Sequence, residues 1–197
     1  KLRSTPDGDG SLLDHSLFLY ASGIRDGNNH GHINVPVLVA GGPCKENILR
    51  GDDVDLYRLP IPTWTAGQDP APYITAGTFL SKDPETGIRN ASNYRLQLKE
   101  KNKFGCLALP FHDGGVHILK NNKLGRPTQV AVVIGSDPTI GLAAVADVPY
   151  GVDELAVAGG LRGGPLELVK CETVDLEVPA SAEIVIEGEV PANYREP

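Results

Sequence analysis

The sequence predicts a β-rich α+β fold with a few short helices, and three observations support this prediction. Glycine and proline are frequent, with 23 and 16 among 197 residues, which suits a fold with many turns rather than long helices. Apolar residues come in short runs such as residues 129–134 (QVAVVI), which are typical of strands covered on both faces. Turn sequences separate these runs: residues 83–87 (DPETG) place aspartate first, proline second and glycine last, a tight-turn pattern.

The turn at residues 83–87 predicts a hairpin between strands at residues 73–80 and 90–99. The first of these strands carries β-branched and aromatic residues, which favour extended backbone. Beyond the hairpin, we expect further strands at residues 17–20, 35–40, 106–110 and 129–134, and two or three more within residues 166–190.

Three helices are expected at residues 116–124, 138–146 and 153–161. The second has Asp137 before it as an N-cap and Pro138 at its first helical position, where the missing N–H of proline costs nothing. Asp153 is a candidate N-cap for the third helix. These helices are short, so strands and turns are expected to make up most of the chain.

Composition excludes several classes of function. The chain carries 18 Lys and Arg against 25 Asp and Glu, a net charge of −7, which is the wrong sign for a general nucleic-acid binder. It has no run of about 18 apolar residues, so no membrane span is expected. Without a signal-peptide pattern we expect a cytoplasmic protein. The three cysteines, Cys44, Cys106 and Cys171, are far apart and odd in number, so we expect free thiols rather than disulfides or a zinc site.

The run at residues 86–97 (TGIRNASNYRLQ) places many polar groups in a predicted strand. It carries amides, hydroxyls, a phenol and guanidinium groups where most strands carry aliphatic side chains. Because burying such groups without partners is costly, a bound ligand is a good candidate for their partner.

Three side chains suggest a metal site. Asn90 offers an amide oxygen, His112 an imidazole and Glu154 a carboxylate, and each follows an apolar element. This mixture suits Mg²⁺ or Mn²⁺ better than zinc. Spacing alone does not bring the three together, so His112 as a loop histidine and Glu154 as a first-turn helix acid remain alternatives.

Arg95 is a candidate anion-binding residue. A buried arginine normally pairs with a carboxylate or a phosphate, and Arg95 follows Tyr94 in a strand that should be partly buried. The alternative is an arginine on the solvated face of a sheet.

Five ordered blocks resemble the UbiD family, the decarboxylases that use prenylated FMN. They read GDDVDLYRLPIPTW (51–64), YITAGTFLSKDPETGIRNASNYRLQL (73–98), QVAVVIGSDP (129–138), GVDELAVAGGLRG (151–163) and LELVKCETVDLEVPASAEIVIEGEV (166–190). The resemblance implies an FMN-binding split β-barrel over residues 43–197. It implies that Asn90, His112 and Glu154 hold one Mn²⁺ (or Mg²⁺) at the cofactor phosphate, with K⁺ nearby. The cofactor would be lined by Ser92, Asn93, Tyr94, Arg95, Ala108, Leu109, Pro110, Asp113 and Gly114.

The activity that the resemblance implies is non-oxidative decarboxylation of an aromatic or α,β-unsaturated acid, with Arg95 in the family's Glu–Arg–Glu network. The implied partners are a small carboxylic acid substrate, a flavin prenyltransferase that supplies the cofactor, and further copies of the chain in a homo-oligomer. The family's two glutamates are expected beyond Pro197, so this stretch alone should lack turnover and lacks the family's C-terminal half. The alternatives are a flavin-binding module without turnover and a non-catalytic interaction fragment.

Residues 1–42 do not look like the start of a UbiD protein. They resemble the C-terminal part of another, uncharacterised bacterial family with a SLLDHSLFLY…DGNNH…NVPVLVAGG pattern, so a domain boundary is expected near residue 43. Asp26, His30 and His32 could form a metal cluster there, although a solvated loop is the alternative interpretation.

Overall fold

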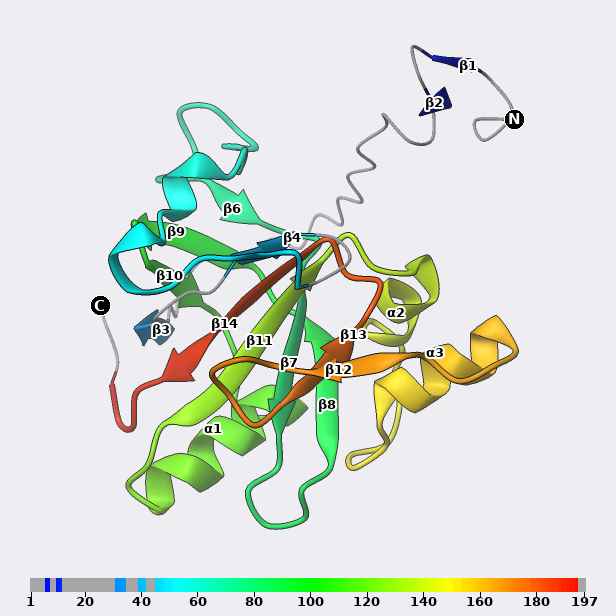
Figure 1. The fold of residues 1–197 in the computed structure, drawn as a ribbon. Helices are drawn as coiled ribbons and strands as arrows, with labels where there is room; N and C mark the ends of the chain where they lie inside the picture. The colour runs from blue at the N-terminus through cyan, green and yellow to red at the C-terminus, as the bar shows by residue number, and fades with distance from the viewer. Residues whose placement is uncertain (1–5, 8–9, 12–30, 35–38, 42–44, 195–197) are drawn as a thin grey trace.

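The computed structural model describes residues 6–7, 10–11, 31–34, 39–41 and 45–194, with side chains from residue 45 onward. Within them the chain forms two antiparallel sheets, two small two-stranded pairs and three α-helices (Figure 1). The small pairs are β1 (Pro6–Asp7) with β2 (Gly10–Ser11) and β12 (Leu168–Lys170) with β13 (Glu177–Pro179). The expected strand at 17–20 and the Asp26, His30 and His32 side chains lie outside the described part. The β-rich α+β fold class is as predicted.

The larger sheet has six described strands, and its centre is the pair formed by two long strands. β11 pairs with β14 over its whole length, from Thr128 opposite Val190 to Ile134 opposite Ile184. In spatial order the strands are β5 (Asn47–Ile48), β4 (Val39–Gly41), β14 (Ile184–Val190), β11 (Thr128–Ile134), β7 (Thr78–Lys82) and β8 (Arg89–Asn93).

The smaller sheet contains, in order, β3 (Gly31–Asn34), β10 (Lys103–Cys106), β9 (Leu96–Glu100) and β6 (Tyr73–Ile74). Neither sheet closes on itself among the described strands, so the split barrel stays a prediction. Two short 3₁₀ turns, Gly51–Asp53 and Leu56–Arg58, precede β6.

Both predicted strands of the hairpin are interrupted, contrary to the prediction of two continuous strands. Residues 73–80 form β6 and β7 in different sheets, and residues 90–99 likewise divide into β8 and β9. The chain changes sheets at Gly77, where a Cβ would lie 2.8 Å from Val132 Cγ1, and again at Tyr94 and Arg95. The hairpin itself is confirmed between β7 and β8. Its turn is closed by the Gly87 N–H, which donates to the Asp83 carbonyl at 2.9 Å.

Strand β11 explains how the larger sheet is buried on both faces. Val130 and Val132 pack with Phe79 and other residues of one cluster, whereas Ala131 and Val133 belong to a second cluster. The first cluster includes residues of the smaller sheet, and the second includes residues of the α2 and α3 helices. The continuous apolar run therefore does what its sequence predicts: alternate side chains fill two separate cores.

Three helices flank the larger sheet (Figure 1). α1 (Asp113–Lys123) contacts β7, β8 and β11, while α2 (Pro138–Ala143) packs on α3 (Glu154–Arg162). The predicted caps are confirmed: Asp137 accepts from the Thr139 N–H at 2.9 Å, and Asp153 from the Leu155 N–H at 3.0 Å.

Other boundaries also differ from those expected, including the end of α2, which lies at Ala143 rather than at residue 146. The strand predicted at residues 106–110 ends at Cys106, and residues 107–110 lead into a turn in which the His112 N–H donates to the Leu109 carbonyl. α1 begins at Asp113 rather than Val116, because Asp113 and two glycines complete its first turn.

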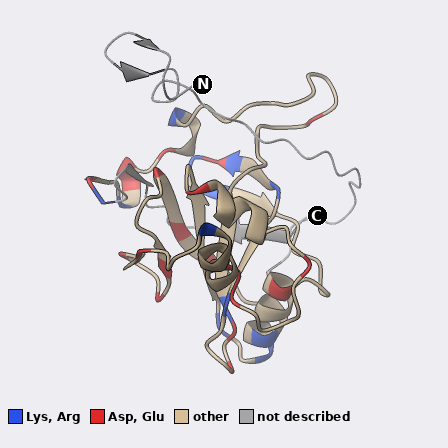
Figure 2. Cartoon of the chain, turned by 90° about the vertical axis from the view of Figure 1, so that its right-hand side faces the viewer, with Lys and Arg blue, Asp and Glu red and all other residues tan. Residues whose placement is uncertain are grey.

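The described surface carries charged residues of both signs (Figure 2). Lys and Arg are interspersed with Asp and Glu in the view of Figure 2. Cys106 is a free thiol in the core. Searching the described residues for a helix that is long and apolar enough to cross a membrane finds none.

The buried His117 of α1 predicts a pH dependence of stability. Its Nδ1 lies 2.9 Å from Ser81 Oγ in β7, and it is 3% exposed. Burial lowers its pKa from 6.5 to about 4. Because the unfolded chain binds the proton more readily, stability is full above pH 6.5 and falls as the pH drops toward 4. Urea unfolding should show about 2 kcal/mol less stability at pH 5 than at pH 7 from this residue.

The control for this prediction is His117→Gln, which cannot titrate. Its own loss of stability between pH 7 and pH 5 should be smaller than that of the unmodified chain by this amount. An equal loss in both proteins would show that His117 is not responsible.

Candidate functional site

The candidate site begins where α3 meets the outermost strand of the larger sheet. β8 is the last described strand of its sheet, so an N–H group on its open edge needs a partner from elsewhere. Glu154, the first residue of α3, provides one: its Oε2 accepts from the Ala91 N–H at 2.8 Å. Glu154 is 5% exposed. Burial raises the pKa of its carboxyl group, and the nearby Asp113 and Asp153 charges add to the rise.

Asn90 is buried next to this contact and lacks a complete set of partners. Its Oδ1 accepts from Ser92 Oγ at 3.1 Å, but its Nδ2 is buried without a hydrogen-bond partner. The oxygen and nitrogen of an amide exchange places by a half-turn of the group. In the turned arrangement, the amide nitrogen would donate to Ser92 and the oxygen would occupy the unpartnered position, as a metal ligand requires.

The start of α1 lies against the end of β8. Tyr94 OH accepts from the Gly114 N–H at 3.2 Å, and the Tyr94 ring stacks on His112 with centroids 6.0 Å apart and planes 9° apart. Burial raises the pKa of Tyr94 to about 12, so the phenol stays neutral. Asp113 is close enough to influence Glu154. Thus β8, α1 and α3 meet around the predicted metal ligands.

The structure only partly assembles a metal centre from protein side chains. Among the described residues, no three His, Cys, Asp or Glu side chains are grouped closely enough to hold an ion. His112 is exposed, unlike Asn90 and Glu154. The buried amide and carboxylate fit a hard divalent cation, which would need further ligands from a bound molecule. The binding of one metal ion by Asn90, His112 and Glu154 together stays a prediction.

The predicted cofactor wall comes from two segments that face each other. One is the end of β8 and the chain just after it, with Ser92, the exposed Asn93, the buried Tyr94 and the half-buried Arg95. The other comprises Ala108, Leu109, Pro110, Asp113 and Gly114. A Cβ on Gly114 would lie 2.9 Å from the Tyr94 ring, so the glycine allows this close approach. Burial raises the pKa of Asp113, against the influence of His112.

Arg95 lies between the two sheets, after β8 has ended. Its Cζ lies 5.1 Å from the centroid of the Tyr73 ring, which suits a cation–π contact. Burial raises the pKa of Tyr73, although the nearby Arg95 charge opposes this rise. The side chain of Arg95 is half-buried, intermediate between the paired and solvated alternatives.

Sequence reasoning missed the polar residues that connect these elements. Arg89 of β8 contacts Asp153, 64 residues away. Asp83 of the hairpin turn pairs with Lys120 of α1 at 2.7 Å and also accepts from Tyr150. No local pattern identifies either contact, because the partners come from separate elements.

Comparison with known proteins gives a consistent result. A family model described as UbiD, 3-octaprenyl-4-hydroxybenzoate carboxy-lyase Rift-related domain, matches residues 37–197. An uncharacterised protein from Aquifex aeolicus (strain VF5) is 43% identical over 157 residues, which cover 79% of this chain and 32% of that protein.

Two solved structures are similar in fold and in sequence. One is an evolved dimeric form of the UbiD-class enzyme HmfF from Pelotomaculum thermopropionicum in complex with prFMN. It has a TM-score of 0.73 and 48% identity, covering 77% of this chain and 35% of that one. The other, the vanillic acid decarboxylase of Sedimentibacter hydroxybenzoicus in closed form, has a TM-score of 0.71 and 34% identity, covering 76% and 33%.

This chain spans about a third of the length of these relatives. The match to the family model nevertheless extends over most of the chain, with the fold of the UbiD-class structures. The chain belongs to the UbiD family.

Proposed function

We propose that this chain forms the cofactor-holding part of a decarboxylase that removes CO₂ from an aromatic or α,β-unsaturated acid. The observation that carries the proposal is the meeting of Asn90, Glu154 and the start of α1 around Tyr94. It is supported by the UbiD-class relative whose structure contains prFMN. When bound, prenylated FMN supplies the electron sink for loss of CO₂.

In this proposal Asn90, His112 and Glu154 hold Mn²⁺ or Mg²⁺ at the cofactor phosphate, with K⁺ nearby. A cation would balance the buried Glu154 carboxylate, whose pKa is raised by burial, and would satisfy the incomplete Asn90 amide. The phosphate would contribute the ligands that the protein side chains do not.

The remaining predicted residues position the cofactor and the substrate. Tyr94, Gly114 and residues 108–110 form a packed wall that would orient the flavin and exclude water. Arg95 holds the substrate carboxylate, because a guanidinium matches that group with paired hydrogen bonds. Its place at the crossing between the sheets leaves it next to the end of the proposed wall.

The wider setting of the proposal follows the family. It includes a split-barrel domain at residues 43–197, whose two sheets also contain β3 and β4 from the preceding residues, a homo-oligomer, a cytoplasmic location and a flavin prenyltransferase as cofactor source. The dimeric form of HmfF supports the oligomer. The family model begins at residue 37, close to the proposed boundary.

Co-expression with a flavin prenyltransferase tests the proposal. The purified chain should retain a flavin, visible in its absorption spectrum, and Mn²⁺ in metal analysis. Glu154→Gln and Asn90→Ala should each reduce both by tenfold or more, because loss of a direct ligand weakens the metal that anchors the phosphate.

Glu167→Gln is the matched control, since Glu167 is an exposed acid outside β8, α1 and α3. It should retain flavin and metal at the level of the unmodified chain. A folded protein that is colourless and free of metal after co-expression would overturn the proposed function.

A further inference from the structure

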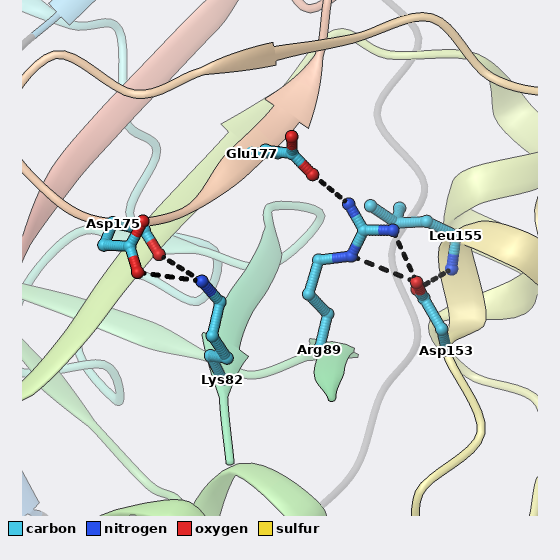
Figure 3. A network of polar contacts seen from close by, with 6 residues as sticks. All are labelled: Lys82, Arg89, Asp153, Leu155, Asp175 and Glu177. Carbon is cyan, nitrogen blue, oxygen red and sulfur yellow. Dashed lines mark hydrogen bonds and ion pairs between the residues drawn. The ribbon is translucent and has the colours of Figure 1, made fainter. Parts of the chain in front are cut away.

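Arg89 connects β8 to the residue just before α3. Its Nε and Nη2 both donate to Asp153 Oδ2, at 3.0 and 2.6 Å, and its Nη1 donates to Glu177 Oε2 at 2.8 Å (Figure 3). The Arg89 and Asp153 side chains are only 21% and 22% exposed. This ion pair is therefore screened less by salt than a pair on the open surface.

Asp153 makes a second contact with its other carboxylate oxygen. Its Oδ1 accepts from the Leu155 N–H at 3.0 Å, which caps α3, while Oδ2 faces Arg89 (Figure 3). One carboxylate thus fixes the start of the helix and ties that start to β8. The next residue is Glu154, whose carboxylate accepts from the Ala91 N–H two residues beyond Arg89.

The two contacts therefore form adjacent links between the same strand and the same helix end. Arg89 with Asp153 is the charged link, and Ala91 with Glu154 is the link made by the predicted metal ligand. A shift of α3 along β8 would have to break both. Partners that orient a metal ligand typically change metal affinity by 10- to 100-fold when removed.

We infer that Arg89, acting through Asp153, is a positioning residue that holds the Glu154 carboxylate at the edge of β8 beside Asn90. The metal part of this inference rests on the proposed function. The geometric part does not, because the Ala91 N–H reports the position of Glu154 whether or not a metal ion is bound.

The experiment compares four variants of this chain. Arg89→Gln removes the guanidinium, and Asp153→Asn removes the charge but keeps an oxygen that can cap α3. Glu177→Gln is the first control, because it breaks the other ion pair of Arg89 and leaves Asp153 in place. Lys82→Gln is the second: Lys82 is the cross-strand partner of Arg89 and pairs with Asp175 at 3.1 Å, away from α3 (Figure 3).

Two measurements are made on each protein. NMR hydrogen exchange follows the Ala91 amide relative to the Val132 amide of β11, so that a change in global stability cancels. Titration with Mn²⁺ in the presence of FMN, whose phosphate can supply the ligands that the protein side chains do not, followed by electron paramagnetic resonance, gives the metal affinity.

In Arg89→Gln and Asp153→Asn, the Ala91 amide should exchange about tenfold faster relative to Val132, and Mn²⁺ should bind about tenfold more weakly. Both controls should stay within about twofold of the unmodified chain. Unchanged Ala91 exchange in Arg89→Gln would overturn the inference, as would equal acceleration in the control variants.

The two proposals can fail separately. If the unmodified chain binds no Mn²⁺ while Ala91 exchange still responds to Arg89→Gln, the positioning role stands and the metal site fails. If Mn²⁺ binds but neither measurement responds to Arg89→Gln, the metal site stands and the positioning role fails.

Discussion

Replacing Gly115 with alanine is expected to lower the free energy of unfolding by about 3 kcal/mol, near the upper end for an added methyl group. Gly115 lies in the first turn of α1. A Cβ there would lie 1.9 Å from the Leu109 carbonyl oxygen and 2.7 Å from the Leu109 carbonyl carbon. Both atoms belong to the backbone, so no side-chain rotation relieves the clash, and either α1 or residues 108–110 must move. Urea unfolding measures the loss.

The same change should also reduce flavin retention in the co-expression test, because it pushes residues 108–110 of the proposed cofactor wall away from the start of α1. Gly160→Ala is the matched control: Gly160 lies within α3, and a Cβ there meets no atom within 4 Å. Alanine stabilises a helix more than glycine does, so the free energy of unfolding of this variant should rise by about 0.5–1 kcal/mol. If Gly115→Ala unfolds at the same urea concentration as the unmodified chain, the close packing at Leu109 is wrong.

Asp83→Ala is expected to cost about 3 kcal/mol of stability, because it removes a buried carboxylate that pairs with the half-buried Lys120. Asp83 is 2% exposed. Its carboxylate accepts from Lys120 Nζ at 2.7 Å, from the Glu85 N–H at 2.8 Å, and from the Tyr150 hydroxyl. One side chain thus joins the hairpin turn, α1 and the loop before α3. Urea unfolding at pH 7 measures the effect.

Lys82→Gln is the control for this change, because Lys82 is the adjacent residue but its pair with Asp175 lies at the surface. It should cost less than about 1 kcal/mol. If Asp83→Ala loses as little stability as Lys82→Gln, the role given to the buried carboxylate is wrong.

The sign of the acid dependence gives a second check on Asp83. Burial raises the pKa of this carboxyl group, but hydrogen bonds from Lys120, Tyr150 and two backbone N–H groups outweigh burial and hold the pKa well below its usual range. The stabilisation by Asp83 is therefore full above the unfolded pKa near 4 and disappears as the pH falls below it. Asp83→Ala should lose less stability than the unmodified chain in that acidic range.

Features that depend on neighbouring residues could be predicted from the sequence. The run at 129–134 corresponds to β11 because alternate residues fill two cores. Asp137 and Asp153 cap α2 and α3 because a carboxylate next to a helix start finds free N–H groups. The turn at 83–87 is as expected for the same local reasons.

Features that depend on distant residues could not be predicted in this way. Nothing near residues 75–77 or 94–95 indicates that the chain passes from one sheet to the other, since this depends on which strands pair. Spacing did not bring Asn90 next to Glu154; the resemblance to a family implied it, and the Ala91 contact shows the two elements adjoining. The Arg89–Asp153 pair has no local sequence signal.

The order of strands in the larger sheet has a consequence for synthesis of the chain. β11 acquires its partner β7 from residues already made, but its other partner, β14, begins at Ile184. About 50 residues, or roughly 3–10 seconds of translation, separate the end of β11 from the start of that strand. During this interval the edge of β11 that later pairs with β14 is open, and an open apolar edge favours pairing with other chains. A nascent chain stalled before residue 184 should therefore recruit chaperones more strongly than one stalled after residue 190.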